Sequence, residues 1–289
     1  MKMAALALIT DAIAIRDFES AANACDTLAA TENPDTINGW HYHLTCLASV
    51  LRTGAPHYSI FKTDGNSKLP FVAFSALPGK KFCPGAGDCL LWCYSFKAWR
   101  YPAAFARQVQ NTFLLSTPDG RAEIVNSLAE ISAKLLRKGT AEFDARIYVD
   151  GDFRDQVDVA FWAFLMRRFP KVGFYGYSKS FLLLLAAHAA GIRMPENYTL
   201  NISGGHNADE DTVQAMMRLP YVRGHFKAVS IGRKVRNADH GKRETNSALR
   251  AAYGRKAFPC PGKCGTCTPK GHACGSAAFK GIDIIIAVH

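Results

Sequence analysis

The sequence predicts an α/β fold, and three observations lead to this prediction. The chain has 289 residues, of which 48% are hydrophobic and 20% charged, so it can bury a core. Apolar runs of strand length alternate with segments of helical periodicity between residues 145 and 231. Such alternation is typical of parallel βαβ units. The composition also excludes disordered, collagen-like and coiled-coil chains.

The first 55 residues are predicted to form a helical region. Apolar spacing indicates helices over Asp11–Ala30 and Trp40–Arg52, separated by Asn-Pro and Asn-Gly pairs that break helices. Cys25 and Cys46 fall inside these helices. Because cysteine is among the most buried residue types, both are interpreted as small core residues without a function.

A β-hairpin and two long helices are expected next. The hairpin strands are His57–Lys62 and Pro70–Leu77, and Asp64-Gly65-Asn66 between them is typical of a tight turn. Helical periodicity then covers Tyr101–Leu115 and Arg121–Lys138.

The alternating part of the chain is predicted to be the βα core. Its strands are expected at Arg146–Val149, Val172–Tyr177, Tyr198–Ile202 and Lys227–Ile231, with a last strand at Ile282–Val288. Its helices are expected at Gln156–Phe169, Ser180–Gly191 and Asp209–Arg218. We therefore divide the chain into a helical region (1–55), a βα core (56–256) and a cysteine-rich segment with the last strand (257–289).

The charge balance favours an anionic partner. The chain carries 35 Lys and Arg against 24 Asp and Glu, a net charge of +11, which suits nucleic acid or an anionic membrane surface, and charge alone does not identify which. Many of these charges fall in one segment, residues 233–256: Arg233, Lys234, Arg236, Lys242, Arg243, Arg250, Arg255 and Lys256. The longest apolar run, Phe181–Ile192, is far shorter than the ~20 residues of a membrane span. Asp11 interrupts the apolar start of the chain, so we expect a cytoplasmic protein without membrane association.

Seven of the nine cysteines fall into two groups, and the first group lies on a Gly-rich loop. Cys83, Cys89 and Cys93 have the spacing C-x5-C-x3-C. Three thiolates can hold a [4Fe–4S] cluster and leave one iron open, as in radical S-adenosylmethionine enzymes. The usual spacing in those enzymes is C-x3-C-x2-C, which this chain lacks. A zinc site with a histidine as fourth ligand is the alternative.

The second group is C-x3-C-x2-C-x6-C, formed by Cys260, Cys264, Cys267 and Cys274. Four thiols within fifteen residues, separated by Gly and Pro, predict a zinc ion or an iron–sulfur cluster with a structural role. A further alternative is that one of these four cysteines completes the first cluster. Disulfides are disfavoured because clustered thiols in a reducing compartment usually bind metal or serve redox chemistry.

Polar residues follow two of the predicted strands, where α/β folds place functional groups. Asp150 and Asp152 come after the first core strand, where two carboxylates could bind a divalent cation or position a substrate. Either could instead cap the following helix. Lys179 follows the next strand and could contact a phosphate or carboxylate, or simply remain solvated.

A glycine pair follows the third core strand. Gly204 and Gly205 allow a close approach of the backbone to a ligand, such as the methionine part of S-adenosylmethionine. His206 stands where an acidic residue would be expected in such a site, and could act as ligand or base.

Short motifs spread over residues 60–289 occur together in this chain. They are Asn66-Ser-Lys68-Leu69-Pro70, Phe74-Ser-Ala-Leu77-Pro78, Cys83-Pro-Gly-Ala86, Cys89, Cys93-Tyr94, Asn111, Gly151-Asp152-Phe153, Tyr175-Gly-Tyr177-Ser-Lys179 and the closing cysteine group. In this order they resemble the phage and plasmid proteins of the gene product 88 family. The resemblance implies a partial (βα) barrel like the radical SAM fold, with the cysteines as cluster or metal ligands.

Three functions are compatible with these features. The first is a radical-SAM-like iron–sulfur enzyme that acts on an anionic or nucleic-acid substrate, with S-adenosylmethionine as a cofactor. The second is a nuclease in which Asp150, Asp152 and Asp155 hold a divalent cation and the cluster is structural. The third is a non-enzymatic phage or plasmid protein, stapled by zinc or a cluster, that interferes with a host or competing element. Its basic face would bind a host or plasmid protein, or nucleic acid.

Overall fold

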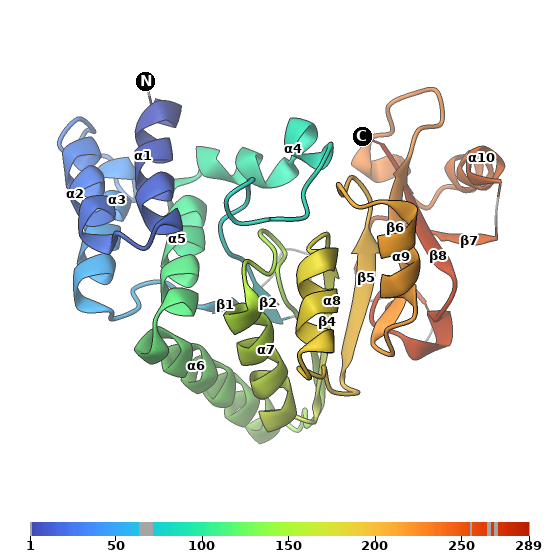
Figure 1. Cartoon of the computed structure of the whole chain (residues 1–289). Helices are drawn as coiled ribbons and strands as arrows, with labels where there is room; N and C mark the ends of the chain where they lie inside the picture. Colours follow the sequence, from blue (N-terminus) through green and yellow to red (C-terminus); the bar gives the residue numbers. More distant parts are fainter. Residues whose placement is uncertain (1, 64–71, 255, 265–266, 269–270, 289) are drawn as a thin grey trace.

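The computed structural model describes residues 2–63, 72–254, 256–264, 267–268 and 271–288. In this part of the chain eight strands form one open sheet in the order β1-β2-β3-β4-β5-β6-β8-β7 (Figure 1). β1 is antiparallel to β2, and the other neighbouring strands run parallel. The predicted α/β class is confirmed.

The strands are β1 (Phe61–Lys62), β2 (Val72–Phe74), β3 (Phe143–Arg146), β4 (Val172–Ser178), β5 (Tyr198–Ser203), β6 (Val222–Val229), β7 (Ala257–Pro259) and β8 (Asp283–Ala287). The α-helices are α1 (Lys2–Ala14), α2 (Phe18–Ala29), α3 (Trp40–Thr53), α4 (Cys89–Trp92), α5 (Pro102–Ser116), α6 (Pro118–Arg137), α7 (Gln156–Arg168), α8 (Phe181–Ala189), α9 (Glu210–Met217) and α10 (Arg243–Tyr253). Short 3-10 helices cover Tyr94–Arg100, Asn237–Asp239 and Ala277–Phe279. None of the helices in the described ranges is both long and apolar enough to cross a membrane.

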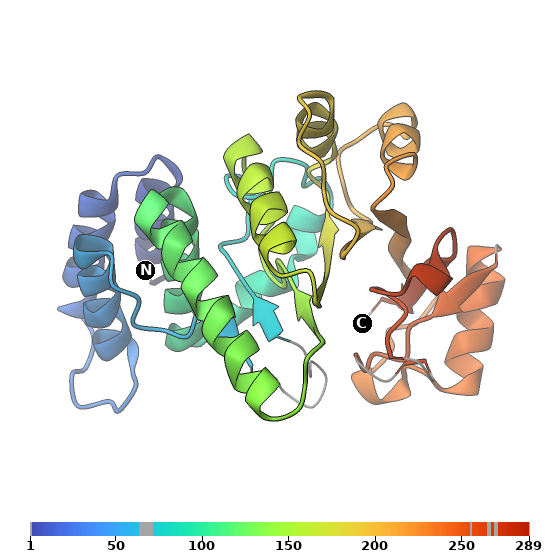
Figure 2. The ribbon, with the colours of Figure 1, turned by 90° about the horizontal axis from the view of Figure 1, so that it is seen from below.

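The two faces of the sheet are covered differently. Figures 1 and 2 show α7, α8 and α9 on one side of the curved row of strands. Because side chains alternate along a strand, Phe174 of β4 joins the large core on this helical face, together with Trp162. Its neighbours Tyr175 and Tyr177 join a separate cluster with Cys274. We call the face that carries Tyr175 and Tyr177 the inner face.

The N-terminal helices α1, α2 and α3 pack together and against α5. Leu6 of α1 and Leu44 of α3 are fully buried and belong to the same hydrophobic cluster as Phe105 of α5. That cluster continues to the helical face of the sheet, so the N-terminal helices and the sheet share one continuous core.

The prediction of one helix over Asp11–Ala30 is wrong, because the chain breaks between α1 and α2. Arg16 adopts a left-handed conformation (φ 62°), which an α-helix cannot contain. Asp17 then caps α2, its carboxylate accepting a hydrogen bond from the Ser20 N–H at 3.0 Å.

The predicted bounds of two strands differ from those of β3 and β6 in the structure. β3 lies three residues before the predicted strand Arg146–Val149, since Tyr148 has a positive φ of 51° and leaves the extended conformation. β6 begins at Val222, five residues before the predicted Lys227, because Val222 pairs with Leu200 of β5. The antiparallel hairpin pairing of β1 and β2 is confirmed, while the predicted turn at residues 64–66 lies outside the described residues.

Candidate functional site

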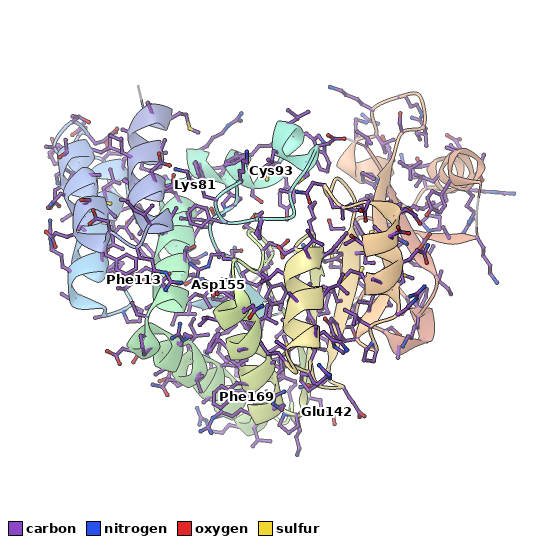
Figure 3. The ribbon with its side chains drawn as sticks, viewed as in Figure 1. Lys81, Cys93, Phe113, Glu142, Asp155 and Phe169 are labelled. Carbon is purple, nitrogen blue, oxygen red and sulfur yellow. The ribbon has the colours of Figure 1, made fainter. Side chains whose placement is uncertain are left out.

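All seven cysteines of the two groups line one cavity of ≈ 260 Å³ on the inner face of the sheet. They are Cys83, Cys89, Cys93, Cys260, Cys264, Cys267 and Cys274. The segment that carries the first three crosses the end of the sheet at which the parallel strands finish, and Figure 3 shows Cys93 beside α4. Every cysteine of the chain, including Cys25 in α2 and Cys46 in α3, is a free thiol.

Backbone hydrogen bonds hold the first cysteine loop against the loop that follows β5. The N–H groups of Gly87 and Cys89 both donate to the Gly205 carbonyl, at 3.0 and 3.3 Å. In the other direction the Asn207 N–H donates to the Gly85 carbonyl at 3.1 Å. Of the predicted glycine pair, Gly205 therefore supports the cysteine loop, while the Gly204 N–H donates to the Phe226 carbonyl of β6.

Glycines allow this contact because a side chain would not fit. A Cβ on Gly85 would lie 1.6 Å from the carbonyl oxygen of Lys179, after β4. Gly205 has a positive φ of 77°, and a Cβ there would approach Cys89 to 3.0 Å. The loop between residues 83 and 93 is thus pressed onto the ends of β4 and β5.

The second cysteine group enters the cavity from the other edge of the sheet. Cys260 directly follows β7, and its N–H donates to the Ile285 carbonyl of β8 at 2.7 Å. The Cys274 carbonyl accepts from Asn201 Nδ2 of β5 at 2.9 Å. Cys83 and Cys260, 177 positions apart in the sequence, are in this way brought to one site.

His272, between Cys267 and Cys274, is a wall residue of the cavity whose ring nitrogens are both engaged. Its Nδ1 accepts from the Gly275 N–H at 3.1 Å, so Nε2 carries the proton and faces an Asp144 carboxylate oxygen at 3.2 Å. This arrangement anchors the second cysteine group to β3. It leaves neither nitrogen free for a metal.

Burial disfavours the ionised form of several thiols in the cavity. Burial raises the pKa of Cys83 and Cys89, that of Cys260 to about 12 and that of Cys274 to about 11. Within the described ranges no three His, Cys, Asp or Glu side chains are already gathered closely enough to hold a metal ion. The seven thiols share the cavity without forming a completed coordination shell.

Asp152 connects the ends of β3 and β4. Both of its carboxylate oxygens accept hydrogen bonds: from Ser178 Oγ and the Lys179 N–H, each at 2.7 Å, and from the Phe153 N–H at 2.8 Å. Burial raises its pKa, and these hydrogen bonds oppose the rise. Because its acceptor capacity is used by the protein, Asp152 positions the Lys179 backbone. Asp150 lines the same cavity.

Lys179 reaches across the strand ends. Its Nζ donates to Ser203 Oγ, at the end of β5, at 2.8 Å, and both residues line the cavity. Among the candidate residues, Asp150, Asp152 and Lys179 are thus brought together with the seven cysteines.

Three candidate residues lie behind the cysteine loop. Gly204, Gly205 and His206 are not part of the cavity wall that the described residues form. His206 forms an isolated β-bridge with Ala86 and packs against Phe181, and burial lowers its pKa. The helix cap considered for Asp150 or Asp152 is instead Asp155, which accepts from the Asp158 N–H at 2.8 Å and pairs with Arg16.

The sequence reasoning missed several wall residues of the inner face. Arg146, Tyr175, Tyr177 and Tyr94 line the cavity, and the Arg146 guanidinium lies over the Tyr177 ring, 4.7 Å from its centroid. A cation in a strand between apolar residues is a signal that could have been noticed. Its neighbours could only be known from the fold.

One comparison with known proteins gives a match. A family described as Gene product 88 matches residues 50–280, which covers the sheet up to β7 and both cysteine groups. The match begins before residue 60, where the motifs start, and so includes the end of α3. No curated protein and no solved structure matches the chain.

Proposed function

The chain belongs to the gene product 88 family, and from this membership together with its seven-thiol cavity we propose that it is an iron–sulfur enzyme with a radical-SAM-like partial barrel. One observation carries the proposal: two cysteine groups, far apart in sequence, line a single cavity at the carboxyl ends of parallel strands, together with Asp152 and Lys179. Ligand sites of α/β folds occupy this edge.

The donor set fits a [4Fe–4S] cluster at the first group. Cys83, Cys89 and Cys93 supply three thiols from one loop, and three ligands leave an iron position for a small molecule. Thiol ligands lose their protons when metal binds, and binding is coupled to local ordering. This coupling explains how thiols that are not yet gathered would become ligands.

The residues of this chain would hold and enclose the reactants. Gly85 and Gly87 fix the cysteine loop over the strand ends, and Asp152 fixes the backbone of Lys179. The Lys179 ammonium, oriented by Ser203, faces the same space and would attract an anionic group. A bound cluster would supply one-electron reduction, the chemistry by which S-adenosylmethionine is cleaved.

The second group suits a structural role. Cys260, Cys264, Cys267 and Cys274 form a small apolar cluster with Tyr175 and Ile284, separate from the main core. Four thiols complete the coordination of one zinc ion or one cluster and leave no open position. Bound metal there would stabilise the C-terminal part of the inner face.

Anaerobic purification followed by absorption, paramagnetic resonance and analysis of iron, sulfide and zinc tests the proposal. We expect a brown protein with absorption near 400 nm. Substitution of Cys83, Cys89 or Cys93 by Ala is expected to remove the cluster assigned to the first group. Cys46→Ala, in α3 outside the cavity, is the matched control and should keep the full iron content. Stoichiometric zinc without iron would contradict the proposal.

A second candidate, binding of nucleic acid, is favoured by the exposed basic segment. Arg233, Lys234, Arg243, Arg250 and Lys256 are exposed and form no ion pair with a described residue, while Arg255 lies outside the described residues. Such charges bind phosphates with an affinity that falls steeply with salt. Fluorescence anisotropy with labelled single- and double-stranded DNA at two salt concentrations tests this; an affinity unchanged in an Arg243→Gln, Arg250→Gln variant would contradict it.

A further inference from the structure

Arg146 is a half-buried cation in the wall of the cavity. It is the last residue of β3, and its side chain lies on the inner face, in the wall that also contains both cysteine groups. The guanidinium stacks over Tyr177, and its Nε is shielded from solvent. An arginine cannot be deprotonated in a protein, so a full positive charge is kept at this position.

Within the described residues the Arg146 guanidinium contacts the ring face of Tyr177 but no carboxylate. The Arg146 Nε has no hydrogen-bond partner, and no carboxylate of the described ranges forms an ion pair with the guanidinium. The ring face of Tyr177 offsets part of the hydration that the partly buried cation loses, but it provides no acceptor for the Nε–H donor. The retention of this cation at the wall of a cavity therefore points to a partner from outside the chain.

Two other arginines that are shielded from solvent, Arg223 and Arg154, are each held by several acceptors. Arg223 of β6 donates to Asn201 Oδ1 at 2.6 Å and to the carbonyls of Phe279 and His225 at 3.0 Å, and also to the Ile282 carbonyl. Arg154 is held by Asp158 and by two further acceptors. Arg146 alone of these three faces a cavity.

A second cation faces the same space. Lys179 also lines the cavity, and its Nζ contacts Ser203 Oγ but forms no ion pair with a described carboxylate. Of the two acidic groups in the wall, Asp152 is occupied by protein donors and Asp150 remains. Besides the cysteines, the wall contributes the tyrosine rings of Tyr94, Tyr175 and Tyr177.

We propose that Arg146 binds the oxyanion, a carboxylate or a phosphate, of a small-molecule substrate held in this cavity. The guanidinium edge presents paired N–H donors that match either group, while its face rests on Tyr177. This deepens the proposed function by naming the substrate class: a metabolite-sized anion rather than a nucleic-acid duplex, for which a cavity of ≈ 260 Å³ leaves no room. The oxyanion site itself does not depend on which metal the thiols hold.

The test is calorimetric titration of the full-length, anaerobically purified protein with inorganic phosphate and, separately, with malonate. We expect the protein to bind at least one of them. Binding of phosphate would indicate a phosphorylated substrate, and binding of malonate would indicate a carboxylate substrate. Arg146→Met should weaken this binding about tenfold or more, as expected for a lost charge-assisted pair, and Arg146→Lys should weaken it less. Arg250→Met, exposed on α10, is the control and should bind like the wild type.

Two results would overturn the inference. One is equal binding by the wild type and Arg146→Met, and the other is no binding of either anion by the wild type.

Absorption near 400 nm, recorded on the same samples, separates this inference from the proposed function. Loss of iron in Arg146→Met without any effect on anion binding would assign Arg146 to the metal and reject the oxyanion site. Anion binding that depends on Arg146 in a protein without iron would keep the site and reject the iron–sulfur proposal. If Arg146→Met does not fold, Arg146→Lys decides between these outcomes.

Discussion

Gly85 and Lys179 are in direct backbone contact, so close that a Cβ on Gly85 would lie 1.6 Å from the Lys179 carbonyl oxygen. Gly85→Ala should therefore force the cysteine loop away from the end of β4. We expect a loss of about 3 kcal/mol in the free energy of unfolding, the upper part of the range for overpacking, and a marked loss of bound iron. Urea unfolding and iron analysis measure both.

Gly204→Ala is the matched control for this substitution. Gly204 lies after β5, and a Cβ there would meet its nearest neighbour, the Phe226 carbonyl oxygen, at an ordinary contact distance of 3.7 Å. This variant should keep its iron and its stability. Equal behaviour of the two variants would show that the close approach at Gly85 does not position the loop.

Asp152→Asn should destabilise the protein, whereas Asp150→Asn should not. An amide at position 152 can accept on only one of its two atoms, so at least one of the donors Ser178 Oγ and Lys179 N–H loses its partner in a buried place. We expect a loss of about 1–3 kcal/mol for Asp152→Asn. Thermal unfolding measures it, and an unchanged midpoint would favour a role in binding a cation instead.

Arg154→Met should be the most destabilising of the ion-pair substitutions. Arg154 and Asp158 are 11% and 1% exposed, with N···O at 2.8 Å, and they hold the segment after Asp152 against α7. Removal of the cation leaves the Asp158 carboxylate buried and unpaired, at a cost of about 3–5 kcal/mol. Lys81→Met breaks an exposed pair with Asp11 and should cost about 0–1 kcal/mol. Similar losses in the two variants would contradict this interpretation.

Acidification should destabilise the N-terminal helices through His43. This side chain is buried beside Tyr58, and burial lowers its pKa below the ordinary value of 6.5. Below pH 6.5 the unfolded chain therefore takes up a proton that the folded chain resists, and stability falls as the pH drops toward the lower pKa. The fall in unfolding midpoint between pH 7.5 and 5.5 should be smaller in His43→Gln. An equal fall of the unfolding midpoint in the wild type and in His43→Gln would show that His43 does not contribute to the pH dependence of stability.

His272→Gln should leave the metal content of the second cysteine group unchanged. Both ring nitrogens of His272 are used within the protein, by Gly275 and Asp144, so the metal would not depend on them. Cys264→Ala, by contrast, should lose metal from this group. Metal analysis of the two purified variants checks the prediction, and a comparable loss in both would make His272 a ligand.

The helices of the core could be predicted closely from the sequence, whereas several boundaries could not. The apolar run that ends at Val149 includes Ile147 and Tyr148, which are buried although they lie after β3. In most of the sheet the buried residues are also the ones in strands, but Ile147 and Tyr148 are buried outside β3. A prediction from hydrophobicity alone therefore places the end of this strand too late. In β6 the reverse holds: Arg223 and His225 interrupt the apolar pattern, although the backbone is paired.

The cysteines of the candidate site could be identified from spacing, but their shared cavity could not. Two local groups are visible in the sequence, and whether they meet depends on the strand order that places β8 and β7 after β6. The same limit applies to Arg146 and Tyr177, whose contact requires β3 and β4 to be neighbours. The spacing of residues in the sequence identifies the candidate ligands, and the strand order of the sheet determines which of them line the same cavity.

The two parts of the cavity wall are translated at different times. The loop of Cys83 is translated long before Cys260 and Cys274, and the second half of the wall requires β8 to pair with β6 and β7 to pair with β8. Until then we expect the first three thiols to lack the cover that the second cysteine group provides. Metal delivered at that time meets an open site, and metal delivered after release meets an enclosed one.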